Sequence, residues 1–132
     1  MKKLCLAVLL ATTLFACEGE ANLPGPDLVL NDLYQVWVHS HEENPSGSVQ
    51  IYRPENSRQF PVSRFRDVFE FKDDGNCRYL FLSPNDAHFM KDGTFVYVPD
   101  TGDLTVNDDT GQAVYKFRLI QLEDEVMTLQ LR

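Results

Sequence analysis

The sequence predicts an all-β domain: an antiparallel up-and-down meander of eight short strands that closes as a barrel. Two observations predict it. Apolar and polar residues alternate with period two in one run after another, and short segments rich in glycine, aspartate and asparagine separate the runs. Each strand must bury one face and the sheet must protect its edges, and a closed barrel does both. A two-sheet β-sandwich is the alternative that the same pattern leaves open.

The predicted strands follow one another through short connections. The cleanest alternation lies in Tyr115-Lys116-Phe117-Arg118-Leu119, where every second side chain is apolar. Asp74-Gly75 and Asp92-Gly93 are typical of tight turns, because these residues accept the left-handed conformations that hairpins need. The strands are expected at residues 33–40, 49–52, 68–72, 76–82, 94–98, 103–106, 113–122 and 126–131.

The segment from Pro54 to Arg66 interrupts this pattern. Its prolines and its Asn56-Ser57 pair are typical of turns, and its apolar residues have no clear period. We therefore expect it to cross one end of the barrel as a loop, with room for a helical turn.

The first seventeen residues predict export and a lipid anchor. Met1-Lys2-Lys3 is basic, and the apolar run that follows is too short to span a bilayer but has the length of a signal-peptide core. The run ends in Leu14-Phe15-Ala16-Cys17, which resembles the lipobox of bacterial lipoproteins. The resemblance implies cleavage before Cys17 and attachment of acyl chains such as palmitate to that cysteine. We expect residues 1–16 to be a lipoprotein signal peptide and the chain to be anchored in the bacterial cell envelope, at the outer membrane.

The charge balance separates the remaining chain from nucleic-acid binders. The sequence has 20 acidic and 12 basic residues, and removal of the signal peptide takes away two of the lysines. No basic stripe remains, so we expect no nucleic-acid partner and a lipid membrane as the partner of Cys17. Residues 17–29 combine the lipidated cysteine with a tether that contains glycine and proline, and residues 30–132 form the barrel domain.

Several short motifs within residues 30–132 resemble a group of small bacterial lipocalin-like proteins. The first are Trp37-x-x-Ser40-x-Glu42-Glu43 and Tyr52-Arg53-Pro54. The pattern continues with Pro61-x-Ser63-Arg64-x-Arg66, Phe69-x-Phe71, Asp74-Gly75, Pro84-x-Asp86 and Gly93. The chain departs from true lipocalins at Gln35, where they have a glycine, and at Phe95, which replaces a tryptophan. The resemblance implies a barrel and does not transfer a ligand.

Aromatic side chains on the inward face are the candidate ligand-binding residues. An eight-stranded barrel is just wide enough to be filled by its side chains or to hold one small ligand. We expect non-catalytic binding of a small apolar or amphipathic molecule; the alternative is a protein–protein interaction or inhibitor module with a filled core. The candidates are Trp37, Phe69, Phe71, Tyr79, Phe81, Tyr97, Tyr115 and Phe117, with Phe95 on the same face.

Acidic and basic residues of the best-matched stretch predict structural ion pairs. Glu42 and Glu43 precede three arginines, Arg53, Arg64 and Arg66. We expect one glutamate to accept a bidentate pair of hydrogen bonds from an arginine of the crossing loop, which would hold that loop against the barrel. The alternative is a role of these residues in binding an anionic ligand.

Metal and catalytic chemistry have little support in the sequence. His39-x-His41 places two imidazoles on one strand face, and Glu42, Glu43 or His88 would have to add a ligand, so the pair is a weak metal candidate. Cys77 alternates with aromatic residues and is expected to be a small buried side chain. Motifs of hydrolases, metalloproteases and nucleotide-binding enzymes are absent from the sequence, so we expect no enzyme, no catalytic residue and no cofactor.

Overall fold

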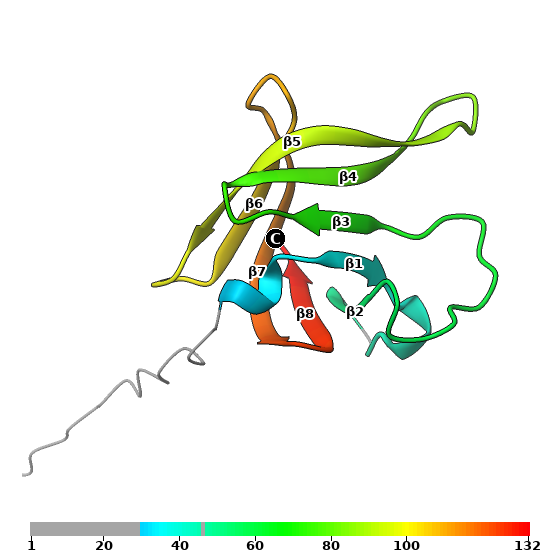
Figure 1. Cartoon of the computed structure of the whole chain (residues 1–132), viewed down its shortest axis with the longest axis horizontal. Helices are drawn as coiled ribbons and strands as arrows, with labels where there is room; N and C mark the ends of the chain where they lie inside the picture. The colour runs from blue at the N-terminus through cyan, green and yellow to red at the C-terminus, as the bar shows by residue number, and fades with distance from the viewer. Residues whose placement is uncertain (1–29, 46) are drawn as a thin grey trace, which may run out of the picture.

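The computed structural model describes residues 30–45 and 47–132. Within this part of the chain, eight strands form one closed antiparallel barrel (Figure 1). The predicted fold class is thereby confirmed, and the sandwich alternative is excluded. The predicted signal peptide, Cys17 and the tether up to residue 29 lie outside the described residues. No helix in the described ranges is long and apolar enough to cross a membrane.

The strands and two short 3₁₀ helices account for most of the described chain. η1 spans Leu30–Leu33 and η2 spans His41–Glu43. The strands are β1 Val36–His39, β2 Val49–Pro54, β3 Val68–Phe71, β4 Asn76–Leu82, β5 His88–Val98, β6 Asp103–Asn107, β7 Ala113–Glu123 and β8 Val126–Leu131.

The strand order departs from a simple meander at one place. Strands β3 to β8 are consecutive neighbours, but β1 lies between β2 and β3, and β2 pairs with β8. The segment of residues 55–67, here called the crossing segment, must therefore pass β1 to reach β3. On β1, Val38 points outward, because its neighbours Trp37 and His39 point inward. Val38 is nevertheless only 7% exposed, which is consistent with the crossing segment covering the outer face of β1.

The β4–β5 hairpin is longer than the sequence predicts. Its turn lies at residues 83–87, where the Ser83 N–H donates to the Ala87 carbonyl over 2.9 Å, and β5 already begins at His88. The interpretation of Asp92-Gly93 as a turn is wrong, because both residues lie inside β5. A Cβ at Gly93 would overlap the carbonyl oxygen of Asn107, so this glycine permits a close approach of two backbones.

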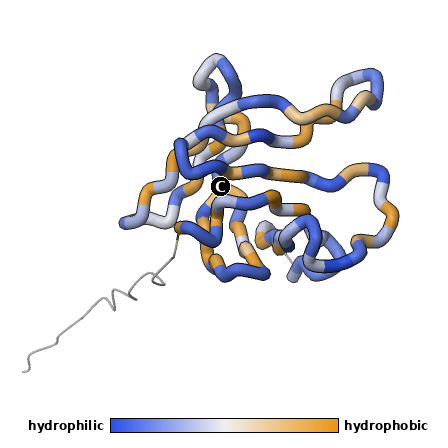
Figure 2. Tube along the Cα trace, viewed as in Figure 1, coloured by the Kyte–Doolittle hydropathy of each residue, from blue (hydrophilic) through white to orange (hydrophobic). Residues whose placement is uncertain are grey.

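Aromatic rings fill the centre of the barrel. The ring of Phe69 has four ring neighbours, Tyr52, Phe71, Tyr115 and Phe117, at centroid distances of 5.1–5.8 Å. These distances are those of aromatic pairs in contact. Hydrophobic residues alternate with hydrophilic ones along the strands in Figure 2, as the burial pattern requires.

The two ends of the barrel differ. At the η1 end lie η1, the β5–β6 turn and the β7–β8 turn; at the η2 end lie η2, the β4–β5 turn and the β6–β7 turn. The described chain begins in η1, at the η1 end of the barrel (Figure 1).

Candidate functional site

The predicted ligand-binding aromatics are not all buried to the same degree. Trp37, Phe69, Phe71, Tyr79 and Phe117 are at most 3% exposed and belong to the core. Phe95, Tyr97 and Tyr115 are partly buried and pack against that core. Phe81 lies farther along β4, opposite Phe89, with the Lys91 ammonium 4.8 Å from its ring centroid. The aromatic residues of the inward face therefore form a packed interior, and Phe81 lies beyond this core, toward the β4–β5 turn.

Arg66 joins the crossing segment to η2. Its guanidinium binds Glu42 in a bidentate arrangement, with Nη1 donating to Oε2 over 2.9 Å and Nη2 donating to Oε1. The same guanidinium donates to the carbonyl of His39 over 3.0 Å and to that of Pro61 over 2.6 Å. The Arg66 side chain is 10% exposed. This is the arrangement that the sequence predicts for a glutamate and an arginine of the crossing loop.

A second cluster surrounds Glu43. Arg53 on β2 donates to Glu43 from Nε over 3.0 Å and from Nη2 over 2.9 Å, and Arg58 of the crossing segment lies 3.0 Å from the same carboxylate. Arg58 is missing from the sequence prediction, since the loop pattern does not reveal which arginines face the glutamates. Arg64 does not join either cluster; it pairs with Asp86 at 3.3 Å, and both side chains are exposed.

The guanidinium partners lower the pKa of both glutamates. Hydrogen bonds from Arg66 lower the pKa of Glu42 from its ordinary value of 4.5 to about 2. Hydrogen bonds from Arg53, and then from Ser40, lower the pKa of Glu43 to about 2. The guanidinium groups of Arg53 and Arg66, which an anion would need, are already paired with these carboxylates, so the network holds the crossing segment rather than binding an anion.

His39 is buried at the η2 end with a partner at each ring nitrogen. Its ring stacks on Tyr52 at 4.9 Å, and its Nδ1 lies 3.5 Å from the Asp67 carboxylate. The Asn44 side-chain amide lies beside His39 Nε2, with its nitrogen at 2.9 Å and its oxygen at 3.2 Å, and the same oxygen accepts the Ile51 N–H over 2.9 Å.

These contacts leave His39 poorly suited to bind a metal ion. Its ring centroid is 5.7 Å from that of His41, but its Nε2 is already in contact with the side-chain amide of Asn44. Across residues 30–45 and 47–132, no group of three or more His, Cys, Asp and Glu side chains is placed to hold a metal. Sequence reasoning missed Asn44 and Asp67, although Asp67 directly precedes the strand predicted at 68–72.

Cys77 lies inside the barrel wall at 1% exposure. Burial raises the pKa of its thiol to about 11, so almost none of it is thiolate at neutral pH. A nucleophilic role has no support in this environment.

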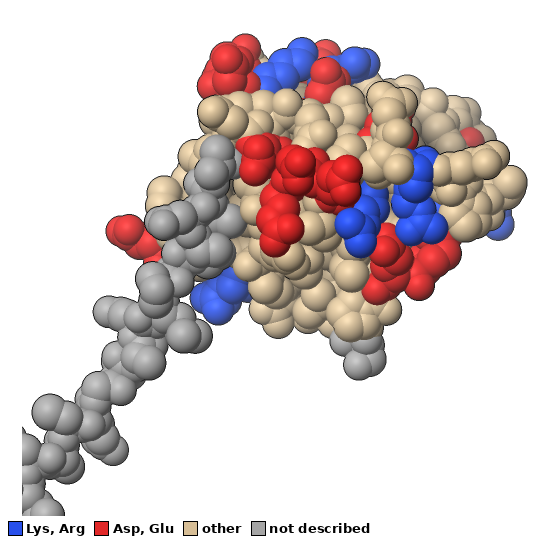
Figure 3. Space-filling view, turned by 60° about the horizontal axis from the view of Figure 1, so that its bottom comes forward, with Lys and Arg blue, Asp and Glu red and all other residues tan. Residues whose placement is uncertain are grey.

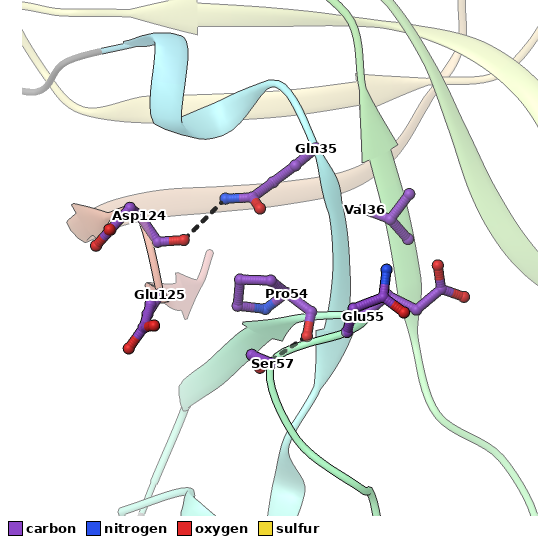
Figure 4. A pocket seen from close by; sticks show the side chains of 8 residues that line it. Gln35, Val36, Pro54, Glu55, Ser57, Asp124 and Glu125 are labelled. Carbon is purple, nitrogen blue, oxygen red and sulfur yellow. Dashed lines mark hydrogen bonds between the residues drawn. The ribbon is translucent and has the colours of Figure 1, made fainter.

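A charged groove lies at the η1 end, on the outside of the barrel. It has a volume of about 420 Å³, and its carboxylates are Glu55, Asp124 and Glu125 (Figure 4). The Gln35 amide donates to the Asp124 carbonyl over 3.1 Å and fixes one side of the groove. A neighbouring groove of about 330 Å³ shares Ser57 and Glu125 with it and includes the Glu43 cluster. The two grooves therefore adjoin and together carry more carboxylates than guanidinium groups.

Charged side chains gather on the lower face of the barrel of Figure 1. Figure 3 turns this face forward and shows a group of acidic side chains with basic side chains beside it. The β7–β8 turn, which supplies Asp124 and Glu125, lies at the bottom of Figure 1.

Comparisons of this chain with protein-family models, with curated proteins and with solved structures found no match. The relation to lipoproteins and to lipocalin-like proteins therefore stays a prediction from the sequence.

Proposed function

We propose that this chain is a lipid-anchored protein of the bacterial cell envelope whose barrel is a non-catalytic protein-interaction module. The observation that carries the proposal is the filled centre of the barrel, where Phe69 contacts four other rings. A barrel of this size holds a ligand only where its side chains leave room. A carrier of a small apolar molecule, the other function that the sequence predicts, would need that space.

The charged groove is the surface that we assign to the partner. Glu55, Asp124 and Glu125 line it, while the arginines of the adjoining groove are neutralised in part by Glu43. Such a surface favours a protein that presents basic side chains, because opposite charges speed association and select the partner. The excess of acidic residues in the whole chain acts in the same direction.

The position of the groove is consistent with a partner at the membrane. Leu30, the first residue that the structure describes, lies in η1 at the same end of the barrel as the β7–β8 turn. With Cys17 acylated, this end of the barrel is held within the reach of a short tether from the lipid surface. The groove would then face proteins that are themselves close to the membrane.

The first experiment asks whether the barrel carries a small molecule. The chain is purified from its own envelope extract and examined by native mass spectrometry before and after denaturation. We expect the mass of the acylated chain without an additional small ligand. A small apolar molecule that is released on denaturation would overturn the interaction module and establish the carrier.

The second experiment tests the anchor and the groove separately. Metabolic labelling with palmitate should mark the wild-type chain, and Cys17→Ala should abolish the label.

Chemical cross-linking in cells should yield a complex with another protein, and Asp124→Lys combined with Glu125→Lys should abolish it. Asp100→Lys is the matched control, because this exposed acidic residue lies in another turn at the same end. Equal loss with both variants would remove the groove from the proposal.

A further inference from the structure

The β4–β5 hairpin extends beyond its neighbours and leaves one strand edge unpaired. β6 pairs with β5 only from Thr94 to Val98, and β5 begins six residues before Thr94, at His88. In Figure 1 the free part of the hairpin projects away from the barrel at the end opposite η1. Natural sheets usually cover or blunt such an edge, because its backbone groups can pair with another strand.

The backbone groups that face outward on this edge follow from the register. Ser83–Ala87 and Gly75–Phe95 are hydrogen-bonded pairs of the hairpin, so every second pair between them, including Phe81–Phe89, is hydrogen-bonded too. His88, Met90 and Asp92 belong to the alternate pairs, whose N–H and C=O groups point away from β4. Among the described residues, no strand pairs with this side of β5 between His88 and Asp92.

Apolar and charged side chains accompany the free edge. Phe89 is 46% exposed, and Leu82, at the end of β4, is 39% exposed. The Asp92 side chain is 88% exposed, and the Lys91 ammonium lies over the ring of Phe81. The edge thus offers hydrogen-bonding groups, an exposed ring and both signs of charge within five consecutive residues.

We propose that a second copy of this chain occupies this edge, by antiparallel pairing of the two β5 strands about a two-fold axis at Met90. The sequence of the edge is complementary to itself in this register. Met90 would face the other Met90, His88 would face Asp92, and Phe89 would face Lys91. All outward N–H and C=O groups of these three alternate residues would find partners, giving about six backbone hydrogen bonds.

The side-chain pairs of this register are favourable on both faces of the strand. His88 opposite Asp92 places an imidazole beside a carboxylate, and Lys91 opposite Phe89 places a cation beside an aromatic ring. The second pair repeats between the two copies the contact that Lys91 already makes with Phe81 within one chain. A two-fold pair of this kind is closed and does not extend into a fibre. This inference depends neither on the lipid anchor nor on the charged groove.

The oligomeric state is measured on residues 18–132, which contain every strand of the barrel, by sedimentation velocity over a range of concentrations. We expect a dimer. Met90→Pro removes an N–H that the hairpin itself does not use, and should weaken association at least about tenfold while the far-UV circular dichroism stays unchanged. Met90→Thr keeps the N–H and should still form the dimer. A wild-type chain that is monomeric at all concentrations would overturn the proposal, and so would a Met90→Pro dimer as tight as that of the wild type.

A cross-linking experiment tests the register without a proline. Chains with Phe89→Cys and chains with Lys91→Cys are oxidised alone and as an equal mixture. We expect disulfide-linked dimers in the mixture only, because the proposed pairing puts residue 89 of one copy opposite residue 91 of the other. Cys77 is buried and is present in both variants, so it cannot account for cross-linking that occurs only in the mixture. Efficient cross-linking of either chain alone, or of none, would contradict this pairing.

Discussion

The indole Nε1 of Trp37 donates a hydrogen bond to the carbonyl of Leu33 over 3.0 Å, and both residues are completely buried. The bond joins η1 to β1 across the gap between them. It gives the only polar atom of the indole a partner where no water reaches it. The η1 end of the barrel is closed by this pair.

Trp37→Phe should lower the free energy of unfolding by about 2–4 kcal/mol, since it removes part of a buried ring and leaves the Leu33 carbonyl without this donor. Urea unfolding followed by circular dichroism measures the change. A loss below about 0.5 kcal/mol would mean that the η1 end repacks and that the hydrogen bond has little weight.

Phe69→Ala should be among the most destabilising single substitutions, with a loss of about 3–5 kcal/mol, because Phe69 is the ring that four other rings surround. Phe81→Ala is the matched control, since Phe81 lies outside the buried core. Its effect should be clearly smaller in the same urea titration. Similar losses for both variants would contradict a core centred on Phe69.

Glu42 and Glu43 should make the domain sensitive to acid. Their pKa values are about 2 in the folded chain, below the ordinary value of 4.5, so their contribution to stability is fully present above pH 4.5. It is lost as the pH falls from about 4.5 to about 2. Glu42→Gln and Glu43→Gln should flatten the decline of stability in this range, as measured by urea unfolding at a series of pH values. Glu55→Gln is the control, because Glu55 has no ion pair in the described part of the chain. A decline as steep in the double variant as in the wild type would assign acid sensitivity to other carboxylates.

Gly93→Ala should destabilise the barrel by about 1–3 kcal/mol, because the added methyl group would overlap the Asn107 carbonyl and crowd the Tyr79 ring. Gly111→Asn serves as a comparison at an open turn with φ near +84°, where asparagine is tolerated. In thermal unfolding, the midpoint temperature Tm of Gly93→Ala should be well below that of Gly111→Asn. The reverse order would argue that β5 and β6 can move apart without cost.

Period two in the sequence was sufficient to predict the strands and most of the barrel interior. Trp37, Phe69 and Phe117 all lie where alternation places them, since a strand points successive side chains to opposite faces. The Glu42–Arg66 contact could also be predicted from the sequence, because a glutamate near a strand end and an arginine in a neighbouring loop readily form an ion pair.

Other features leave no trace in a periodic pattern. Alternation says which side a residue faces and not which strand lies beside it, so the position of β1 between β2 and β3 could not be predicted. The start of β5 was missed because His88-Phe89-Met90-Lys91 alternates poorly and Asp92-Gly93 has the composition of a turn. The partner of Arg64 depends on the conformation of a loop whose sequence fits many conformations.

The pairing of β2 with β8 has a consequence for how the barrel forms. Tyr52 lies opposite Met127, so one seam of the barrel joins the early part of the chain to its last strand. Bringing such distant segments together costs loop-closure entropy, and folds rich in distant contacts form slowly. During synthesis or export, β2 and β7 both keep an open edge until β8 has emerged. The last six-residue strand therefore decides when the chain becomes a closed barrel, and a chain cut before it would expose two sheet edges at once.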